Sequence, residues 1–531
     1  MPGKGTTNYL LLSMGIAAIG SMQFGLHLAE LNAPQDVITC RKKFVSTIAG
    51  VVAVVKSAAA PDGHYLDCIP MDEAAFASIS SIFTVGGLIG ALASGPLSSR
   101  RGRLSAMRMT SVLFILGSVL ETIAHSPFLL ALGRFVSGVG AGATTVIVPL
   151  YISELCPPDS RGFFGFMTQV SINFGILLTQ TLGYFLSHGS AWRWILGAGA
   201  CFAIAHGVGL AIVPETPAWL AAHGRVVQAQ DTLQMIRGRD ADVREEMRSL
   251  GLDRVSTAAA ASGADEEERG LLSRRGDEDE DDDDDEHHHH HHHIRNSSDN
   301  DDDNDDGSAT PPNAIPAKTD PVHLGFLQVV RDPATRPVIV ALVGIMFVQQ
   351  FCGINSVIMY SVSLLSDLLP ISSALLSIIV SAANLMTTMA CAPLPDRLGR
   401  KTCLIISILG QGSSSLVLAL SIVFGLKALS ALAVLAFVCF FGVGLGPVPF
   451  ILASELVGQE AIGATQSWCL GANYIATFLV AQFFPIVNKA LNAWLGGAGW
   501  VYFLFAAAAA VSAVFVSWSF RSLRFQAAAG Y

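Results

Sequence analysis

Long apolar runs separated by short polar loops make up most of this chain. A helix crosses about 30 Å of hydrocarbon with about 20 apolar residues, and about twelve runs reach that length. The runs are continuous and lack the period of two that marks the strands of a membrane barrel, so the pattern predicts transmembrane helices. We expect them near residues 8–31, 73–98, 104–124, 127–153, 163–187, 192–213, 336–366, 371–394, 402–424, 428–454, 463–488 and 498–519.

Three sequence markers occur in both halves of the chain at nearly one spacing. A GxGxG motif at Gly138 returns 304 residues later, a Ser-Glu-Leu triplet at Ser153 returns 301 residues later, and the glycine of an arginine-rich loop, Gly102, returns 297 residues later. Agreement of three ordered markers predicts a duplicated six-helix unit. We expect an N-terminal half over 1–213, a linker over 214–335 and a C-terminal half over 336–531.

Composition supports a membrane protein and isolates one unusual segment. Hydrophobic residues make up 51% of the chain and charged residues 14%, against about 25% charged residues in soluble proteins. Segment 265–306 carries 20 Asp and Glu against 4 Arg and includes seven histidines, His287–His293. Such charge runs cannot bury enough surface to fold, so we expect a disordered cytosolic joint, with an amphipathic helix in 225–250. Histidines bind divalent cations, but a solvated spacer with at most weak metal binding is the favoured interpretation.

Positive charge predicts which ends of the helices face the cytosol. Arginines follow the second span (Arg100, Arg101 and Arg103) and the eighth (Arg397 and Arg400), and cytosolic loops carry an excess of such residues. Both termini are then cytosolic. This orientation places the loop 32–72 outside, where oxidising conditions could join Cys40 and Cys68 in a structural disulfide. The sequence leaves open whether the membrane is the plasma membrane or an internal, vacuolar one.

Several motifs together resemble one known family. They are "GRFVSGVGAG" at 133–142, "PLYISELCPPDSRG" at 149–162, "PETPAWL" at 214–220, "QQFCGINSVIMYS" at 349–361, "PDRLGRK" at 395–401 and "GPVP" at 446–449. With these stretches the chain resembles the sugar porter family of the major facilitator superfamily over essentially both halves. "FGLHLAELNAPQ" at 24–35 is most similar to a fungal branch. The resemblance implies an all-α membrane protein with 12 transmembrane helices in two pseudo-symmetric halves, which rock about a central site.

Amide and aromatic side chains are the candidate sugar ligands. A sugar offers hydroxyl groups and a partly apolar ring face, so its site needs amides that donate and accept hydrogen bonds, together with an aromatic platform. The alternative is that the amides only join helices to one another, which is worth about 0.6 kcal/mol each in a membrane. From the residues and the resemblance we expect a site of Gln169, Gln349, Gln350, Asn355, Asn384, Phe450, Asn473 and Tyr474.

Charged residues near helix ends predict a cytosolic gate. Ion pairs there would hold the two halves in one state, and water would compensate the charges when the pairs break. The alternative is a set of solvated loop charges. The predicted members are Arg101, Arg103, Arg134, Glu154, Arg161 and Glu215 in the first half and Asp396, Arg397, Arg400 and Glu455 in the second, where the network looks thinner.

His27 lies where proton-coupled members of the resembled family carry Asp and many uniporters carry Asn. Histidine titrates near neutral pH, so it is a candidate for proton coupling. Helix packing, or a uniporter's polar substitute, is the alternative that the sequence favours.

The sequence therefore predicts a transporter of a sugar, most simply a monosaccharide, working by alternating access as a uniporter or a proton symporter. No enzyme activity, cofactor, resident metal or nucleic-acid partner is expected. Two alternatives remain. One is a sugar receptor on the same scaffold, and the other is a carrier of another small polar solute or a metal cation. A metal carrier needs facing Asp, Glu or His inside the membrane, and among histidines the spans offer only His27 and His206.

Overall fold

The computed structural model describes residues 7–40, 68–157, 161–238, 241–249, 326–333, 335–358, 373–458 and 461–528. All regular elements within these ranges are helices. The first half contains α1 (Asn8–Ala29), α2 (Gln35–Ile38), α4 (Glu73–Arg101), α5 (Arg103–Thr122), α6 (Pro127–Leu155), α7 (Arg161–Leu186), the short 3-10 helix η2 (Gly189–Ala191) and α8 (Trp192–Gly209).

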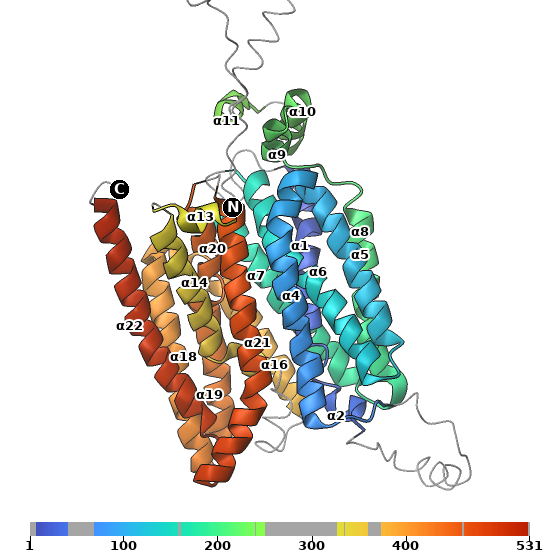
Figure 1. The fold of residues 1–531 in the computed structure, drawn as a ribbon, viewed down its shortest axis with the longest axis vertical. Coiled ribbons are helices and arrows are strands. Elements are labelled where there is room, and N and C mark those ends of the chain that lie inside the picture. The colour runs from blue at the N-terminus through green and yellow to red at the C-terminus, as the bar shows by residue number, and fades with distance from the viewer. Residues whose placement is uncertain are drawn as a thin grey trace, which may run out of the picture. The chain divides into compact units, whose positions relative to one another are not determined.

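The linker region contributes α9 (Pro217–Ala222), α10 (Val226–Arg237), α11 (Arg244–Ser249) and α13 (Gln328–Arg331). The second half contains α14 (Arg336–Phe351), α16 (Ser373–Cys391), α17 (Leu394–Leu398), α18 (Arg400–Val423), α19 (Lys427–Phe440), the π-helical turn η3 (Phe441–Leu445), α20 (Val448–Glu455), α21 (Ile462–Leu495) and α22 (Val501–Ala528). Figure 1 shows the helices of the two halves as two adjacent groups, blue to green and yellow to red.

The helices lie where the apolar runs predict them. Ten helices in the described part of the chain are long and apolar enough to cross a membrane, and α7 and α8 occupy the two remaining predicted spans. The seventh predicted span is interrupted at Gly353, whose φ of +96° is open to glycine at little cost. Beyond Ile358 that span falls outside the described residues.

Close packing of small residues joins the helices of each half. Any side chain at Gly138 or Gly142 of α6 would overlap the backbone of α4 at Phe83 or Gly87, as in other tight helix contacts within membranes. In the second half, a Cβ at Gly444 would overlap the backbone of α18 at Cys403. The repeated GxGxG motif is therefore a packing motif in both halves.

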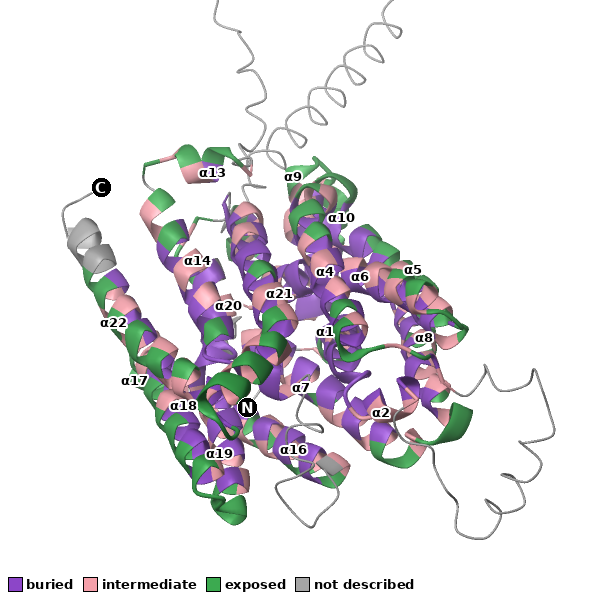
Figure 2. Cartoon of the chain, turned by 60° about the horizontal axis from the view of Figure 1, so that its bottom comes forward, coloured by how far each residue is buried: buried purple, intermediate pink, exposed green. Residues whose placement is uncertain are grey.

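Apolar side chains cover the outside of the bundle as well as its core. Buried residues face the middle of the bundle, while exposed residues line the outer faces of α22 and α5 (Figure 2). Trp518 on α22 is 64% exposed and Val511 is 71% exposed. Such continuous apolar surface requires an apolar partner, which the lipid of a membrane provides.

The arginine-rich loops have one conformation in both halves. Gly102 links α4 to α5 with φ +95° and ψ 154°, and Gly399 links α17 to α18 with φ +86° and ψ 147°. Both backbone conformations are essentially restricted to glycine. The match supports the duplication that the sequence predicts.

The first part of the linker packs onto the first half. In α10, the apolar residues Ala229, Leu233 and Ile236 are buried, as the predicted amphipathic helix requires, and Arg237 donates a hydrogen bond to Leu155 O at the end of α6 (2.8 Å). We call this end of the bundle the linker end. α11 belongs to a separate unit of the chain. Segment 265–306 with its histidines lies outside the described residues, so the role of that tract stays a prediction. The division of the chain at 213/214 and 335/336 also stays a prediction.

The opposite end carries a disulfide between Cys40 and Cys68, which agrees with the pairing expected from the sequence. We call it the disulfide end. Here Ile69 N donates to Ile38 O (2.8 Å), next to the bridge. The bridge therefore ties the chain after α2 to the chain before α4.

Candidate functional site

A cavity lies between the two halves, about midway along the helices. It encloses about 650 Å³ of space between atoms, counting any part open to solvent. Seven of the eight predicted ligands line it: Gln169, Gln349, Gln350, Asn355, Phe450, Asn473 and Tyr474. The structure adds Phe24, Leu28, Phe83, Thr84, Thr145, Ile172, Asn173, Ile176, Ile354, Ile358, Phe441, Leu470 and Thr477.

The amides of the second half form one connected network. Asn473 of α21 donates to Gln349 Oε1 of α14, and Gln349 donates to Leu445 O (2.6 Å) in η3. Past the break at Gly353, Asn355 donates to Gln350 Oε1 and to Thr477 Oγ1 (3.1 Å). Because these bonds fix the orientation of each amide, the site is organised before any ligand arrives.

The first half contributes a smaller polar group and an aromatic wall. Gln169 of α7 donates to Asn173 Oδ1 (3.0 Å), and Asn173 donates to Thr388 Oγ1 of α16 in the second half (2.9 Å). The rings of Phe24 and Phe83 stack with centroids 6.3 Å apart. The cavity therefore joins an amide-rich wall to an apolar one.

Two predicted ligands occupy special places. Asn384 does not line the central cavity but a neighbouring one of about 300 Å³, and its Nδ2 lies 3.4 Å from Asn173 Oδ1. Tyr474 extends from α21 into the first half, where its hydroxyl lies 3.3 Å from Thr145 Oγ1. Any side chain at Gly87 of α4 would overlap the Tyr474 ring, so this glycine makes room for the tyrosine.

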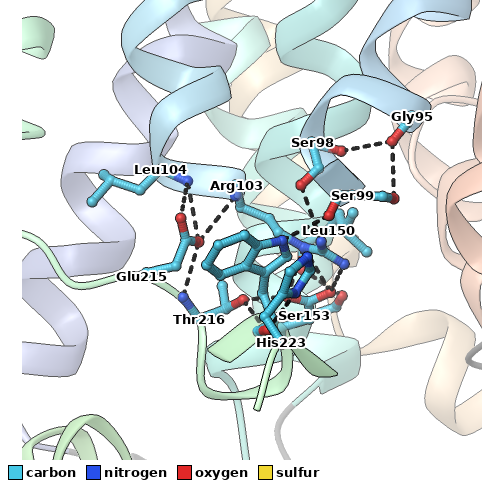
Figure 3. Close-up of polar contacts among 12 residues, drawn as sticks. Gly95, Ser98, Ser99, Arg103, Leu104, Leu150, Ser153, Glu215, Thr216 and His223 are labelled. Carbon is cyan, nitrogen blue, oxygen red and sulfur yellow. Dashed lines mark hydrogen bonds and ion pairs between the residues drawn. The ribbon is translucent and has the colours of Figure 1, made fainter. Parts of the chain in front are cut away.

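At the linker end, Arg103 and Glu154 form a buried ion pair. Their side chains are 9% and 8% exposed, and Arg103 Nε and Nη2 donate to the Glu154 carboxylate at 2.8–3.1 Å. Arg103 Nη1 also donates to Ser98 O (3.1 Å), and Thr216 Oγ1 donates to Glu154 Oε2 (2.6 Å) (Figure 3). The pair therefore joins the α4–α5 turn to the end of α6 and to the start of the linker.

Glu215 accepts hydrogen bonds from the backbone at the start of α5. The N–H groups of Arg103 (3.0 Å) and Leu104 (3.1 Å) donate to its carboxylate, as does Thr216 N (3.1 Å) (Figure 3). A carboxylate is favourable at a helix N-terminus, where backbone N–H groups lack partners. Burial nevertheless raises the pKa of Glu215, and the three backbone hydrogen bonds offset only part of that rise.

The second half has a related but more exposed arrangement. Arg400 pairs with Glu455 (2.9 Å) and with Asp396 (2.9 Å), and its Nη1 donates to Pro395 O (3.1 Å). The side chains of Arg400 and Glu455 are 29% and 38% exposed. The contacts thus repeat those of Arg103, Glu154 and Ser98.

Arg134 does not belong with this group, which corrects the sequence prediction. Its guanidinium pairs with Glu30, which follows α1 towards the disulfide end. Arg134 and Glu154 lie 20 residues apart on α6, which is about 30 Å along a helix, so they cannot share a gate. Of the remaining predicted members, Arg101 and Arg397 are exposed and make no ion pair with another described residue, and the side chain of Arg161 lies outside the described part.

Arg134, Glu30, His27 and Glu121 form a fully buried charged cluster. His27 Nδ1 lies 3.0 Å from Glu30 Oε1, and its Nε2 lies 3.4 Å from Ser118 Oγ. Ser137 donates to Glu121 Oε1 (2.7 Å). None of the four charged or titratable side chains is more than 1% exposed.

Sequence reasoning missed several of these residues, although signals were present. Asn173 and Thr477 each lie four residues after a predicted ligand, on the same helix face. Glu30 and Glu121 fall inside predicted apolar spans, and an ionisable residue there indicates a functional site. The aromatic wall carries no such signal, because the chain has 29 phenylalanines and the sequence does not distinguish those of the cavity.

Comparison with known proteins identifies the family. The family model described as "Sugar (and other) transporter" matches residues 14–257 and 265–525. The chain belongs to this family. A probable metabolite transport protein of Saccharomyces cerevisiae is 30% identical over 96% of this chain and 92% of the relative, and a facilitated trehalose transporter of Apis mellifera ligustica is 27% identical over 84% and 76%. These relatives are transporters.

Solved structures show the same fold. The proton:xylose symporter XylE of the major facilitator superfamily, bound to 6-bromo-6-deoxy-D-glucose, superposes with a TM-score of 0.67 over 96% of this chain and 95% of its own, at 22% identity. The chain therefore has the major facilitator fold of a multi-pass membrane transporter, and the twelve-helix prediction is confirmed.

Proposed function

We propose that this sugar transporter family member carries a neutral monosaccharide through the cavity between its halves by alternating access. The observation that carries the proposal is the cavity itself, where amides of the second half face an aromatic wall of the first. Hydroxyl groups of a sugar can exchange hydrogen bonds with the amides, while the apolar ring face lies against Phe24 and Phe83. Trehalose and glucose transporters among the relatives support a carbohydrate substrate.

The wall chemistry favours an uncharged solute. Among the described residues that line the cavity, none is Asp, Glu, Lys, Arg or His. A phosphorylated or acidic sugar would then lose its hydration without an opposite charge in return, which is costly in an apolar interior. We therefore expect the carrier to reject sugar phosphates and uronic acids.

The orientation is part of the proposal. The linker end carries the arginines of both turns, and the disulfide lies at the other end. Positive residues favour the cytosol and disulfides favour an oxidising compartment. Both features support a cytosolic linker end in either a plasma or a vacuolar membrane. Titratable groups for a proton-linked mode are present in the buried cluster around His27.

The test is uptake of labelled sugars by purified protein in liposomes, across a panel of neutral monosaccharides. Replacing Gln350 and Asn355 together by alanine removes two cavity amides. Because a neutral hydrogen bond contributes about 0.5–1.5 kcal/mol, we expect the apparent affinity of the best substrate to fall by roughly one to two orders of magnitude.

Asn492→Ala is the matched control, because this amide of α21 lies outside the cavity and contacts Asn488. The control should keep wild-type kinetics. Unchanged sugar flux in the double variant would show that the cavity is not the sugar site.

A further inference from the structure

The buried cluster of Glu30, Glu121, His27 and Arg134 contains two carboxyl groups and only one permanently positive group, the Arg134 guanidinium. The positive charge of Arg134 compensates the negative charge of one carboxylate. His27, which contacts Glu30, is neutral unless it gains a proton. With both glutamates ionised, a net negative charge would lie in a region where no charged or titratable side chain is more than 1% exposed. Such a charge is far from water and strongly unfavourable, so the cluster favours the binding of one further positive charge, either a proton or a metal ion.

Two carboxylate oxygens are the candidate positions for that charge. Glu30 Oε2 and Glu121 Oε2 are both buried, and neither has a hydrogen-bond donor among the protein atoms described. One carboxylate oxygen of Glu30 lies within 4.8 Å of one of Glu121. A proton bound to either carboxyl group would remove the excess charge and give that group a donor for a neighbouring oxygen.

The surrounding groups restrict the choice of cation. The ligand atoms of His27, Glu30 and Glu121 lie within 4.8 Å of one another, which suits a metal ion. However, the Arg134 guanidinium occupies Glu30 Oε1 and would repel a divalent ion. One added positive charge is enough to neutralise the cluster.

Among the described residues, His27 and Arg134 are the ionisable groups whose contacts with the two glutamates are established. α1 brings His27, α5 brings Ser118, and α6 brings Arg134 and Ser137. α8 approaches His27 with Gly199.

The Phe83 ring connects this cluster to the central cavity. The Arg134 guanidinium carbon lies 4.4 Å from the centroid of the Phe83 ring, and Phe83 lines the cavity. A cation over an aromatic face is attracted to it. Any movement of Arg134 towards Glu121 would therefore change its contact with a wall of the sugar site.

We infer that Glu30 and Glu121 share a proton, and that its release and rebinding are coupled to sugar movement through Arg134 and Phe83. The coupling rests on the proposed sugar transport, whereas the shared proton does not. Without the proton, Arg134 is attracted by two carboxylates instead of one. His27 is then a hydrogen-bond partner of Glu30 and not the proton carrier.

Infrared spectroscopy of the purified protein tests the shared proton directly. At neutral pH the wild type should show the carbonyl stretch of a protonated carboxylic acid, and Glu121→Gln should lose it. Glutamine keeps an oxygen that accepts from Ser137, so the variant should fold. Glu30→Gln is the second variant, and Glu73→Gln, an exposed glutamate at the start of α4, is the control that should keep the band.

Transport in liposomes tests the coupling. Sugar entry into wild-type liposomes should take up protons, and a pH gradient should drive sugar accumulation in a sodium-free buffer. Glu121→Gln should retain sugar exchange while losing both proton uptake and accumulation.

A wild type without the carboxylic acid band, or a band that persists in both glutamine variants, would overturn the shared proton. Sugar entry without proton uptake, or accumulation that depends on sodium, would overturn the coupling. If no sugar moves at all, the proposed function fails, while the infrared result still decides whether the glutamates share a proton.

Discussion

The arginine turns of the two halves have the same backbone and the same contacts, but they differ in their exposure to water. Arg103 and Arg400 follow glycines of equal conformation, and each donates to a carbonyl five residues earlier and to a glutamate at the end of a later helix. The first pair is 9% and 8% exposed, and the second 29% and 38%. Duplication thus preserved the geometry of the turn while its surroundings diverged.

The linker explains the difference. After α8, the chain passes over the first turn, where Glu215 caps α5 and Trp219 Nε1 donates to Ser99 O (2.8 Å). These contacts exclude water from Arg103 and Glu154. In the described part of the second half, no segment covers Arg400 and Glu455 in this way, and they remain 29% and 38% exposed. The first turn is therefore held more firmly than the second, and variants of equivalent positions should show it.

The largest difference is expected when the arginines themselves are replaced. Arg103→Gln leaves the Glu154 carboxylate, which is 8% exposed, without its positive partner and with only the Thr216 hydroxyl as a donor. Removing one partner of a buried pair costs about 3–5 kcal/mol, whereas a solvent-exposed pair such as Arg400 with Glu455 contributes about 0–1 kcal/mol. Thermal unfolding in detergent should therefore show a much lower midpoint for Arg103→Gln than for Arg400→Gln.

The double variant with Arg103→Gln and Glu154→Gln provides the control, because it removes both charges. It should recover most of the lost stability. Equal midpoints for the two single arginine variants would contradict the contrast between the halves.

An intermediate effect is expected at the glycines of the two turns. Alanine at either position meets a strained backbone that costs about 1–3 kcal/mol. At Gly102 the new Cβ would also overlap the Glu215 carboxylate, whereas at Gly399 nothing lies within 4 Å. Gly102→Ala should therefore lower the unfolding midpoint more than Gly399→Ala.

Combining Gly102→Ala with Glu215→Ala isolates the overlap. The additional loss at Gly102 should largely disappear against the Glu215→Ala background. A persistent excess there would mean that the linker does not cause the difference between the turns.

The sequence predicted the helices, the duplication and seven of the cavity residues, because apolar length and repeated motifs are local signals. The prediction that Arg134 belongs to the cytosolic gate is wrong, although the predicted topology already excluded it. The fourth span begins at the end opposite the arginine loops, so an arginine near its start cannot reach Glu154 near its finish. If each charged residue is first placed at one end of its predicted helix, Arg134 and Glu154 fall at opposite ends of the bundle.

Other features depend on side-chain packing and could not be derived from the pattern. Asn384 lies on the expected helix, yet it lines a neighbouring cavity and contacts Asn173 of the central one. The exposure of Arg400 likewise depends on whether a segment that is distant in the sequence packs over the turn. Neither the cavity that Asn384 lines nor the exposure of Arg400 follows from residue spacing in the sequence.

The smallest effect is expected from pH and should appear at the first turn. Burial raises the pKa of Glu215 above its ordinary value of 4.5. A carboxyl group whose folded-state pKa is raised contributes stability that is fully present below the ordinary pKa and is lost as pH rises through the folded-state pKa. The unfolding midpoint of the wild type relative to Glu215→Gln should therefore fall from about pH 4.5 upwards and then level off.

Measuring both proteins across this pH range cancels the titration of all other groups. Glu73→Gln controls for the loss of one carboxylate, since its difference from the wild type should not follow this curve. A difference for Glu215→Gln that rises with pH would show that the three backbone hydrogen bonds outweigh desolvation, and Glu215 would then stabilise the turn as a charged cap.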